Sequence, residues 1–379
     1  MTTRQGFDLC GVRELRVEDA RRWRDLQLAD TRLRAPTMSL AYLQILDATR
    51  PDVRIARLSQ GADDAFLGVH IRNCGWTAAG LLFNDWQGLI RPQGSASDAA
   101  FLAGAPALTV GSWRGDAEGL PGGAVDAATG YAVELSSGLD AYLEDRRVHA
   151  PDHLKKIRRR LRALEAEHGP VHVCWPDPSR AAREQLLAWK SAQFRRTGRH
   201  DILTSRWLQA FIAAAFDSDH PDCRAELATL HAGDTLVAAE IGFTGLGVNQ
   251  SWLAAYDPGF ARYGPGTLLL HLILQEAPAR AIHRVDLGAG HGDYKHYFGN
   301  ETYTVLSGRY APAETDVGEA ALHRFARWAE HQSFPGARLP GKALRRYAMI
   351  AACEPTLAGR AKGVLSALQG PRAQAAPAT

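Results

Sequence analysis

Residues 252–277 read WLAAYDPGFARYGPGTLLLHLILQEA, and this stretch decides the fold. A strand is predicted to end at Tyr256, and the turn YGPG at 263–266 leads into an apolar helix that begins at Thr267. Helix N-termini expose unpaired N–H groups at the positive end of the helix dipole, and glycine lets an anion approach the backbone closely. The junction is therefore typical of a pyrophosphate site, although a plain helix start with proline at a permitted position has the same pattern.

The elements around this stretch alternate between helices and short strands. Upstream, the pattern predicts a helix at 151–168, a strand at 171–175, helices at 181–196 and 205–216, and strands at 225–231, 235–245 and 248–256. Downstream, the residues IHRVDL at 282–287 are predicted to form another strand. The order is helices, antiparallel strands, and then a turn into a helix.

The first half of the chain repeats this order. Two helices at 17–28 and 39–48 are predicted to open the protein, followed by short strands at 53–58, 65–72 and 79–83. Residues 111–130 carry six glycines and are predicted to be a loop, and YAVEL at 131–135 closes this half as a strand. We therefore predict two α/β units of one plan, with a boundary near residue 150.

The composition excludes several classes of protein. The 379 residues allow two or three units with sizeable cores, and 44 Lys and Arg against 41 Asp and Glu are too balanced for a nucleic-acid binder. The five cysteines form no C-x-x-C pair and are odd in number, so we expect no disulfide framework and a reducing compartment. No stretch resembles a signal peptide or a membrane span, and we expect a cytoplasmic protein.

A second glycine-rich stretch, VDLGAGHG at 285–292, resembles the first motif of S-adenosylmethionine methyltransferases. In that fold the motif ends the first strand, and a whole sheet must follow it. Too few residues remain after 292 to build that sheet, and no acidic strand end follows at the expected distance. A methyltransferase is therefore a disfavoured alternative.

Taken in order, the strands, the glycine turn, the helix and then GDYKHYF at 292–298 resemble the GNAT acyltransferases. The resemblance is closer to the Fem-like, CelD-type branch, which is associated with exopolysaccharide and cell-wall loci. The residues that match are Tyr256-Asp257, Pro265-Gly266, Asp286 and Tyr294-Lys295 in the second half, and Asn84-Asp85-Trp86-Gln87-Gly88 in the first. The resemblance covers roughly residues 15 to 310. The chain departs from the pattern at His271 and in the glycine-rich segment 111–130.

This resemblance implies an α/β (α+β) fold with tandem GNAT-like domains. Each domain would have a mixed, mostly antiparallel sheet flanked by helices, and the two would meet across a central cleft. The implied divisions are 1–150 and 151–312 for the two domains, 313–369 for C-terminal helices, and 370–379 for a disordered tail.

The resemblance also implies an N-acyltransferase that uses an acyl-CoA, most simply acetyl-CoA. Its pyrophosphate would bind at Tyr263 and the N–H groups of Gly264, Gly266, Thr267 and Leu268. Backbone N–H groups on the strand before the turn would stabilise the oxyanion. The candidates for proton transfer and catalysis are Asp85, Glu240, Tyr256, Asp286, Tyr294 and Lys295. Plain structural roles remain open: a solvated strand residue for Glu240, a capping carboxylate for Asp286 and a surface lysine for Lys295.

The acceptor is expected to be an amino sugar or a sugar-linked precursor, bound between the two units. Asp85, Trp86 and Gln87 from the first unit would contact the sugar, and Lys295 would meet a phosphate. We expect no nucleic-acid partner, but allow a peripheral contact with membrane-bound polysaccharide machinery.

Two other features have weaker functional interpretations. Residues 154–163 carry six Lys and Arg without an acid, which suits a phosphate-bearing acceptor but also suits a solvated helix face. The histidines lack metal-ligand spacing, so no metal is expected. Aminoacyl transfer from a charged tRNA, and a non-catalytic binding module, remain alternative functions.

Overall fold

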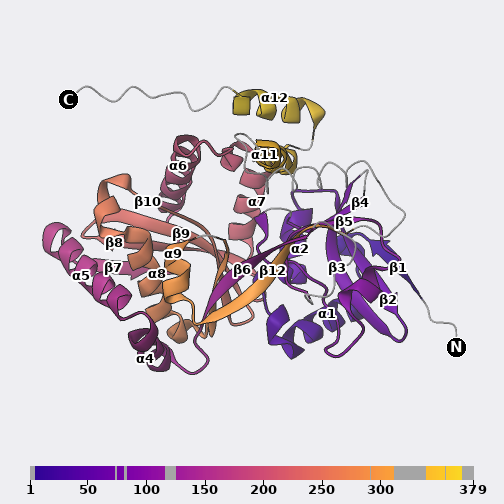
Figure 1. Cartoon of the computed structure of the whole chain (residues 1–379), viewed down its shortest axis with the longest axis horizontal. Helices are drawn as coiled ribbons and strands as arrows, with labels where there is room; N and C mark the ends of the chain where they lie inside the picture. The colour runs from indigo at the N-terminus through magenta and orange to yellow at the C-terminus, as the bar shows by residue number, and fades with distance from the viewer. Residues whose placement is uncertain are drawn as a thin grey trace.

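The computed structural model describes residues 5–72, 75–80, 83–115, 125–290, 292–310, 339–354 and 356–368. The strands in this part of the chain form one sheet in the order β1-β2-β3-β4-β5-β12-β6-β11-β10-β9-β8-β7. Only two neighbouring pairs in it, β4 with β5 and β10 with β11, are parallel. The mixed, mostly antiparallel sheet flanked by helices confirms the predicted fold class, and it excludes the parallel sheet that a methyltransferase requires (Figure 1).

The first half of the sheet is an antiparallel meander that ends in a parallel step. Its strands are β1 (Gln5–Cys10), β2 (Val53–Gln60), β3 (Asp63–Arg72) and β4 (Gly75–Ala78), followed by β5 (Leu108–Trp113) parallel to β4. Helices α1 (Val17–Ala29) and α2 (Leu40–Asp47) connect β1 to β2, and α3 (Asp98–Leu102) precedes β5.

The second half repeats this plan. Its antiparallel strands are β7 (Val171–Cys174), β8 (Arg224–Ala232), β9 (Thr235–Gly245) and β10 (Val248–Tyr256), followed by β11 (Arg284–Ala289) parallel to β10. Helices α6 (Arg180–Arg196) and α7 (Arg206–Asp217) connect β7 to β8, and α8 (Pro265–Glu276) connects β10 to β11. The two halves therefore have the tandem arrangement that the sequence predicts.

The two halves exchange strands at the centre of the sheet. Strand β6 (Val125–Glu134) belongs to the first half by sequence, but it lies between β11 and β12 (Glu301–Tyr310). Strand β12 in turn lies between β6 and β5. The domain boundary near residue 150 therefore remains a proposal. It divides the two repeats in the sequence, but in the sheet each half pairs with a strand that the other half supplies.

The sequence prediction is wrong at the start of the chain and in the third strand. Strand β1 precedes the two helices that were expected to open the protein. The strand expected at 79–83 is β4, four residues earlier, and Ala79 and Gly80 form a turn. Gly80 has a φ of +82°, and a Cβ there would lie 2.6 Å from the Tyr42 hydroxyl, so this position favours a glycine turn.

The glycine-rich segment 111–130 is also not simply a loop. Strand β5 runs to Trp113, and β6 begins at Val125 and includes Gly130. A Cβ at Gly130 would lie 2.1 Å from the ring of Tyr303 on β12, so this glycine makes room for a neighbouring ring within the sheet. Residues 116–124 lie outside the described part of the chain.

One hydrophobic core joins the two halves. It contains Trp23 and Tyr42 from α1 and α2 together with Phe211 from α7 and Phe243 from β9. Tyr42 packs edge-on against both phenylalanine rings, at 5.7 Å from each ring centroid. The helices α4 (Leu139–His149), α5 (Pro151–His168) and α8 cover the other face of the second half, with their own core.

Two helices, α11 (Leu339–Cys353) and α12 (Leu357–Leu368), end the described chain. Helix α11 is attached to the body through its last residues, because Trp207 Nε1 donates to the Ala352 carbonyl (3.1 Å) and Ser205 Oγ to the Cys353 carbonyl (2.8 Å). The predicted tail at 370–379 lies outside the described residues. None of the described helices combines the length and apolar character needed to cross a membrane.

Candidate active site

The centre of the second half is an open splay between β10 and β11. These parallel strands pair at Val248 with Arg284, at Asn249 with Val285 and at Gln250 with Asp286, and then diverge. Beyond that point β10 continues to Tyr256, with an irregular register between Ser251 and Leu253. This edge of β10 therefore has no strand partner in the described chain, and a ligand could pair with its N–H groups. One β10 carbonyl, that of Ala254, already accepts a hydrogen bond from Lys190 Nζ at 2.9 Å.

Helix α8 begins at the mouth of the splay. Gly264 lies just before the helix with a φ of +65°, and its carbonyl accepts hydrogen bonds from the N–H groups of Thr267 (2.9 Å) and Leu268 (3.2 Å). The N–H of Gly264 donates to Ala261 at 3.0 Å. Of the four N–H groups predicted to hold a pyrophosphate, only that of Gly266 has no backbone partner within the described chain.

A positive charge from the basic segment lies against this turn. A Cβ on Gly264 would lie 2.5 Å from Arg160 Nη1, so the guanidinium of Arg160, from α5, covers that glycine closely. The Tyr256 ring lies near Gly266, because a Cβ on Gly266 would lie 4.0 Å from that ring. The turn thus combines one free N–H, the positive end of α8 and a guanidinium, which together suit a phosphate.

Two of the other residues predicted to bind the donor, Tyr263 and Leu268, have side chains buried in the protein. Tyr263 is 3% exposed, and its hydroxyl lies 3.1 Å from His168 Nε2. Leu268 is fully buried in the core beneath α8, while Thr267 lies at the partly exposed surface of the helix. The buried side chains of Tyr263 and Leu268 therefore help to fix the position of the turn.

The two halves bring a carboxylate and an amine together at the end of β11. Gly288 has a φ of +71°, and a Cβ there would lie 3.1 Å from Asp85 Oδ2 and 3.8 Å from Lys295 Nζ. Lys295, on α9 (Asp293–Phe298), also donates to the Ala289 carbonyl at 2.9 Å. Burial and the negative charge of Asp286 raise the pKa of Asp85 to about 6, against the opposing charge of Lys295.

Asp286 organises this turn from inside the protein. It is fully buried, and its Oδ1 accepts hydrogen bonds from the Gly288 N–H (2.9 Å) and the Tyr303 hydroxyl (2.7 Å). Its Oδ2 has no hydrogen-bond partner and lies 3.9 Å from Arg284 Nη2. The capping role that the sequence left open for Asp286 is thus present, and it acts on the turn next to Asp85.

Glu240 and Tyr294 are two further titratable groups of the candidate site, from β9 and α9. Burial raises the pKa of Glu240, on β9, to about 7, and a hydrogen bond from Ser251 and the charge of Lys190 oppose this rise. Burial also raises the pKa of Tyr294 to about 12, with a further contribution from the negative charges of Glu240 and Asp85. Tyr294 therefore lies within electrostatic reach of both carboxylates and keeps its proton at neutral pH.

Residues 151–296 match the family model described as the acetyltransferase (GNAT) domain. This match identifies residues 151–296 as a GNAT domain. The matched residues begin with α5 and end within α9, so they include the splay, the glycine turn and Lys295. This match confirms the GNAT family and the N-acyltransferase class that the sequence motifs predict.

Three of the solved structures that match the chain each cover most of it. A tandem GNAT protein from the clavulanic acid biosynthesis pathway is 11% identical, with 83% of this chain and 100% of that one covered and a TM-score of 0.44. FemX is 10% identical over 72% and 91% of the two chains, with a TM-score of 0.44. A conserved protein of Bacteroides thetaiotaomicron is 11% identical over 80% and 100%, with a TM-score of 0.48. No curated protein matches the chain by sequence.

The first half holds Asp85 next to the GNAT domain through a loop at 83–90. The Gln87 side-chain oxygen accepts hydrogen bonds from the backbone N–H groups of Gly111 (2.8 Å) and Ser112 (3.2 Å), and Ser112 Oγ donates to the Asp85 carbonyl at 2.7 Å. From the GNAT domain, Trp252 Nε1 donates to the Phe83 carbonyl at 2.9 Å. Gln87, predicted to bind the acceptor, instead attaches the Asp85 loop to β5.

Trp86 is likewise buried rather than facing a substrate. Its ring is 1% exposed and lies 3.8 Å from the guanidinium of Arg114, which also lies 3.5 Å from the Tyr303 ring. Polar atoms of Trp86, Arg114, Arg284 and Asp286 are buried here without a hydrogen-bond partner. No motif in the sequence points to Arg114, Arg284 or Tyr303, because they reach the site only through the pairing of β12 with β5 and β6 and of β11 with β6.

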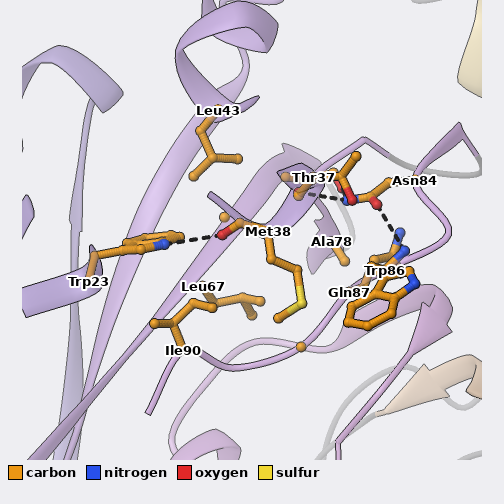
Figure 2. Close-up of a pocket in the computed structure, with 13 residues that line it drawn as sticks. Trp23, Thr37, Met38, Leu43, Leu67, Ala78, Asn84, Trp86, Gln87 and Ile90 are labelled. Atoms are coloured by element: carbon orange, nitrogen blue, oxygen red, sulfur yellow. Dashed lines mark hydrogen bonds between the residues drawn. The ribbon is translucent and has the colours of Figure 1, made fainter. Parts of the chain in front are cut away.

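Among its described residues, the first half has no open splay of its own. The loop 83–90 fills the space beyond β4 and β5, where Ile90 bridges to Phe66 and Gln87 to Trp113. Figure 2 shows the small pocket that remains beside this loop, with Asn84 hydrogen-bonded to Thr37 and to Trp86. Within the described chain, the splay in the GNAT domain is therefore the one place where a long donor can lie between strands.

The described residues include no group of three His, Cys, Asp or Glu side chains placed to hold a metal ion.

Proposed function

We propose that the protein transfers an acyl group from an acyl-CoA, most simply acetyl-CoA, to the nitrogen of an amino sugar or sugar-linked precursor. The observation that carries this proposal is the open edge of β10, which leads from the N-terminus of α8 to Asp85 and Lys295. An extended donor placed along that edge would have its phosphates at one end and its thioester at the other.

The donor's pyrophosphate would bind at the glycine turn. The Gly266 N–H and the Arg160 guanidinium supply a hydrogen bond and a charge there, and the α8 dipole adds to the positive potential. Part of this attraction is electrostatic at a partly exposed site, so donor binding should weaken as salt increases.

The transfer itself needs an amine, an oxyanion site, a base and an acid. The amine nitrogen attacks the thioester carbonyl, and free N–H groups on the open edge of β10 stabilise the oxyanion. Glu240 or Asp85 accepts a proton from the nitrogen, since both have a pKa near neutral. As the carbon–sulfur bond breaks, Tyr294 gives its proton to the leaving thiolate, and the products are an amide and a free thiol.

The acceptor would enter from the side where the two halves meet. Asp85 and Lys295 both lie at that seam, where they could contact a hydroxyl and a phosphate of a sugar. Trp86 and Gln87 act on the acceptor only indirectly in this proposal, because they hold the loop that carries Asp85.

The test is a mass-spectrometric screen of the purified protein with acetyl-CoA against free, nucleotide-linked and lipid-linked amino sugars. We expect release of free thiol together with one acceptor whose mass increases by an acetyl group. Thiol release without any acylated sugar would contradict the acceptor class. Transfer of an aminoacyl group from a charged tRNA, with no turnover of any acyl-CoA, would show that the donor is an aminoacyl-tRNA and would contradict the proposed acyl-CoA donor.

A further inference from the structure

Helix α12 has an apolar face that nothing in the described chain covers. Leu357, Ala361 and Leu365 recur at four-residue intervals and are all exposed; Leu357 is 80% and Leu365 61% exposed. Such spacing places three side chains in one stripe along a helix. We name these three residues the α12 face.

The opposite side of α12 explains why this stripe points outward. A Cβ on Gly363 would lie 2.6 Å from Ile350 of α11, so the two helices pack closely at that glycine. Helix α11 is itself held to the body by the hydrogen bonds from Ser205 and Trp207. Figure 1 shows α12 as the outermost element on that side of the molecule, beyond α11.

The surroundings of the α12 face are basic. Residues 339–368 carry five Lys and Arg and a single acid, Glu354, whereas the whole chain has a net charge of only +3. The rest of the protein is therefore slightly negative overall, and these two helices form a basic segment of the chain in addition to the one at 154–163. Lys362 is exposed next to the α12 face, and on α11 the exposed residues include Arg346 and Tyr347.

We propose that the α12 face binds the surface of an anionic phospholipid bilayer. The leucines of α12, a helix that carries Arg360 and Lys362 and no acid, enter the boundary between headgroups and acyl chains, while the cations of α11 and α12 contact the phosphates. The helix lies along the surface and does not cross the bilayer. This inference is independent of the donor and acceptor of the proposed function.

The charge distribution favours a bilayer over a second copy of the chain. In a symmetric pair the same basic helices would face each other, and their repulsion would oppose contact between the leucines. An anionic surface instead attracts every Lys and Arg of α11 and α12 that lies near it.

The experiment is sedimentation of the full-length protein with vesicles of phosphatidylcholine, with and without phosphatidylglycerol. We expect binding to the vesicles that contain phosphatidylglycerol, little binding to phosphatidylcholine alone, and a decrease as salt is raised. The double variant Leu357→Ser, Leu365→Ser should bind at least about tenfold more weakly, because two apolar side chains are lost from the boundary.

Matched control variants distinguish binding through the α12 face from nonspecific binding of the protein to vesicles. Val148 is an exposed apolar residue on α4 (67% exposed), and Val148→Ser should bind vesicles as the unchanged protein does. Lys362→Glu with Arg346→Glu should weaken binding to anionic vesicles, whereas Arg180→Glu, on the exposed surface of α6, should not.

Three results would overturn the inference. The first is that the unchanged protein fails to bind anionic vesicles. The second is that the double leucine variant binds as well as the unchanged protein while its circular dichroism shows a normal fold. The third is a dimer in size-exclusion chromatography that the same leucine variant converts to a monomer, which would make the α12 face a contact between copies.

Discussion

Glu240 and Asp85 are carboxyl groups that change protonation state near neutral pH, since their pKa values are raised to about 7 and about 6. A base must be deprotonated to accept a proton from the amine, so the rate should rise with pH through this range. Replacing the true base, as Glu240→Gln or Asp85→Asn, should lower kcat by ~10²–10⁴-fold and remove its step from the pH–rate profile. Donor affinity measured by calorimetry should stay nearly constant. If both variants keep the normal profile, neither residue is the base.

Glu240 should also make the stability of the protein depend on pH. Its pKa is higher in the folded protein than in the unfolded chain, so the cost of ionising it is absent below pH 4.5, grows as pH rises, and is complete above about 7. That cost is of the order of 3 kcal/mol. Chemical denaturation of Glu240→Gln should therefore show a gain in the free energy of unfolding at pH 8 and almost none at pH 4. An equal gain at both values would assign the effect to packing instead.

Gly288 has to be a glycine for two separate reasons. A side chain there would be strained by the positive φ and would also lie 3.1 Å from Asp85 Oδ2. Gly61 has a similar φ of +64°, but a Cβ there would meet nothing within 4 Å. Both Gly288→Ala and Gly61→Ala should lose stability, whereas only the former should lower kcat, by about tenfold or more. Equal activity in the two variants would show that the Asp85 carboxylate need not lie at this position.

At the scale of elements, the N-terminus of α8 and Arg160 of α5 together form one positively charged region. Arg160→Gln should raise the Kd for acetyl-CoA about five- to tenfold and leave kcat unchanged, because the guanidinium lies at the turn and not at the thioester. Arg159→Gln changes the neighbouring exposed residue of the same helix and should have little effect. Calorimetry at low and high salt would show the difference shrink as charges are screened. Similar Kd values for the two variants would place the phosphates elsewhere.

Single helices and strands also show which parts of the structure local sequence patterns can predict. The strands at 235–245 and 248–256 follow from local alternation and turn residues, and they appear where predicted. Helix α8 begins at Pro265, two residues before the predicted start, so the Pro-Gly pair belongs to the first turn of the helix. The strand expected at 79–83 is displaced because contact between Gly80 and Tyr42, far apart in sequence, sets the turn. The roles of Gln87 and Trp86 could not be predicted either, since they depend on β5, which runs into the glycine-rich segment, and on Arg114 directly after it.

At the scale of the whole molecule, the two halves should unfold as one unit. They share a sheet, a hydrophobic core and hydrogen bonds such as that from Thr37 Oγ1 to Gln250 Oε1 (2.8 Å). Differential scanning calorimetry should therefore show a single transition whose calorimetric and van't Hoff enthalpies agree. Two separated transitions, or a van't Hoff enthalpy near half the calorimetric value, would show that the halves are thermodynamically independent.

The place of β6 at the centre of the sheet has a consequence for synthesis on the ribosome. Strand β6 ends at Glu134, but its neighbours β11 and β12 begin at Arg284 and Glu301. At ordinary translation speeds of ~5–20 residues per second, β6 waits roughly ten to thirty seconds with both edges unpaired. Its sequence, VDAATGYAVE, is short of large apolar residues and has an acid near each end. A strand of this composition has a low tendency to aggregate while its edges are unpaired. The strand at the centre of the finished sheet is therefore one that can remain exposed during synthesis without promoting aggregation.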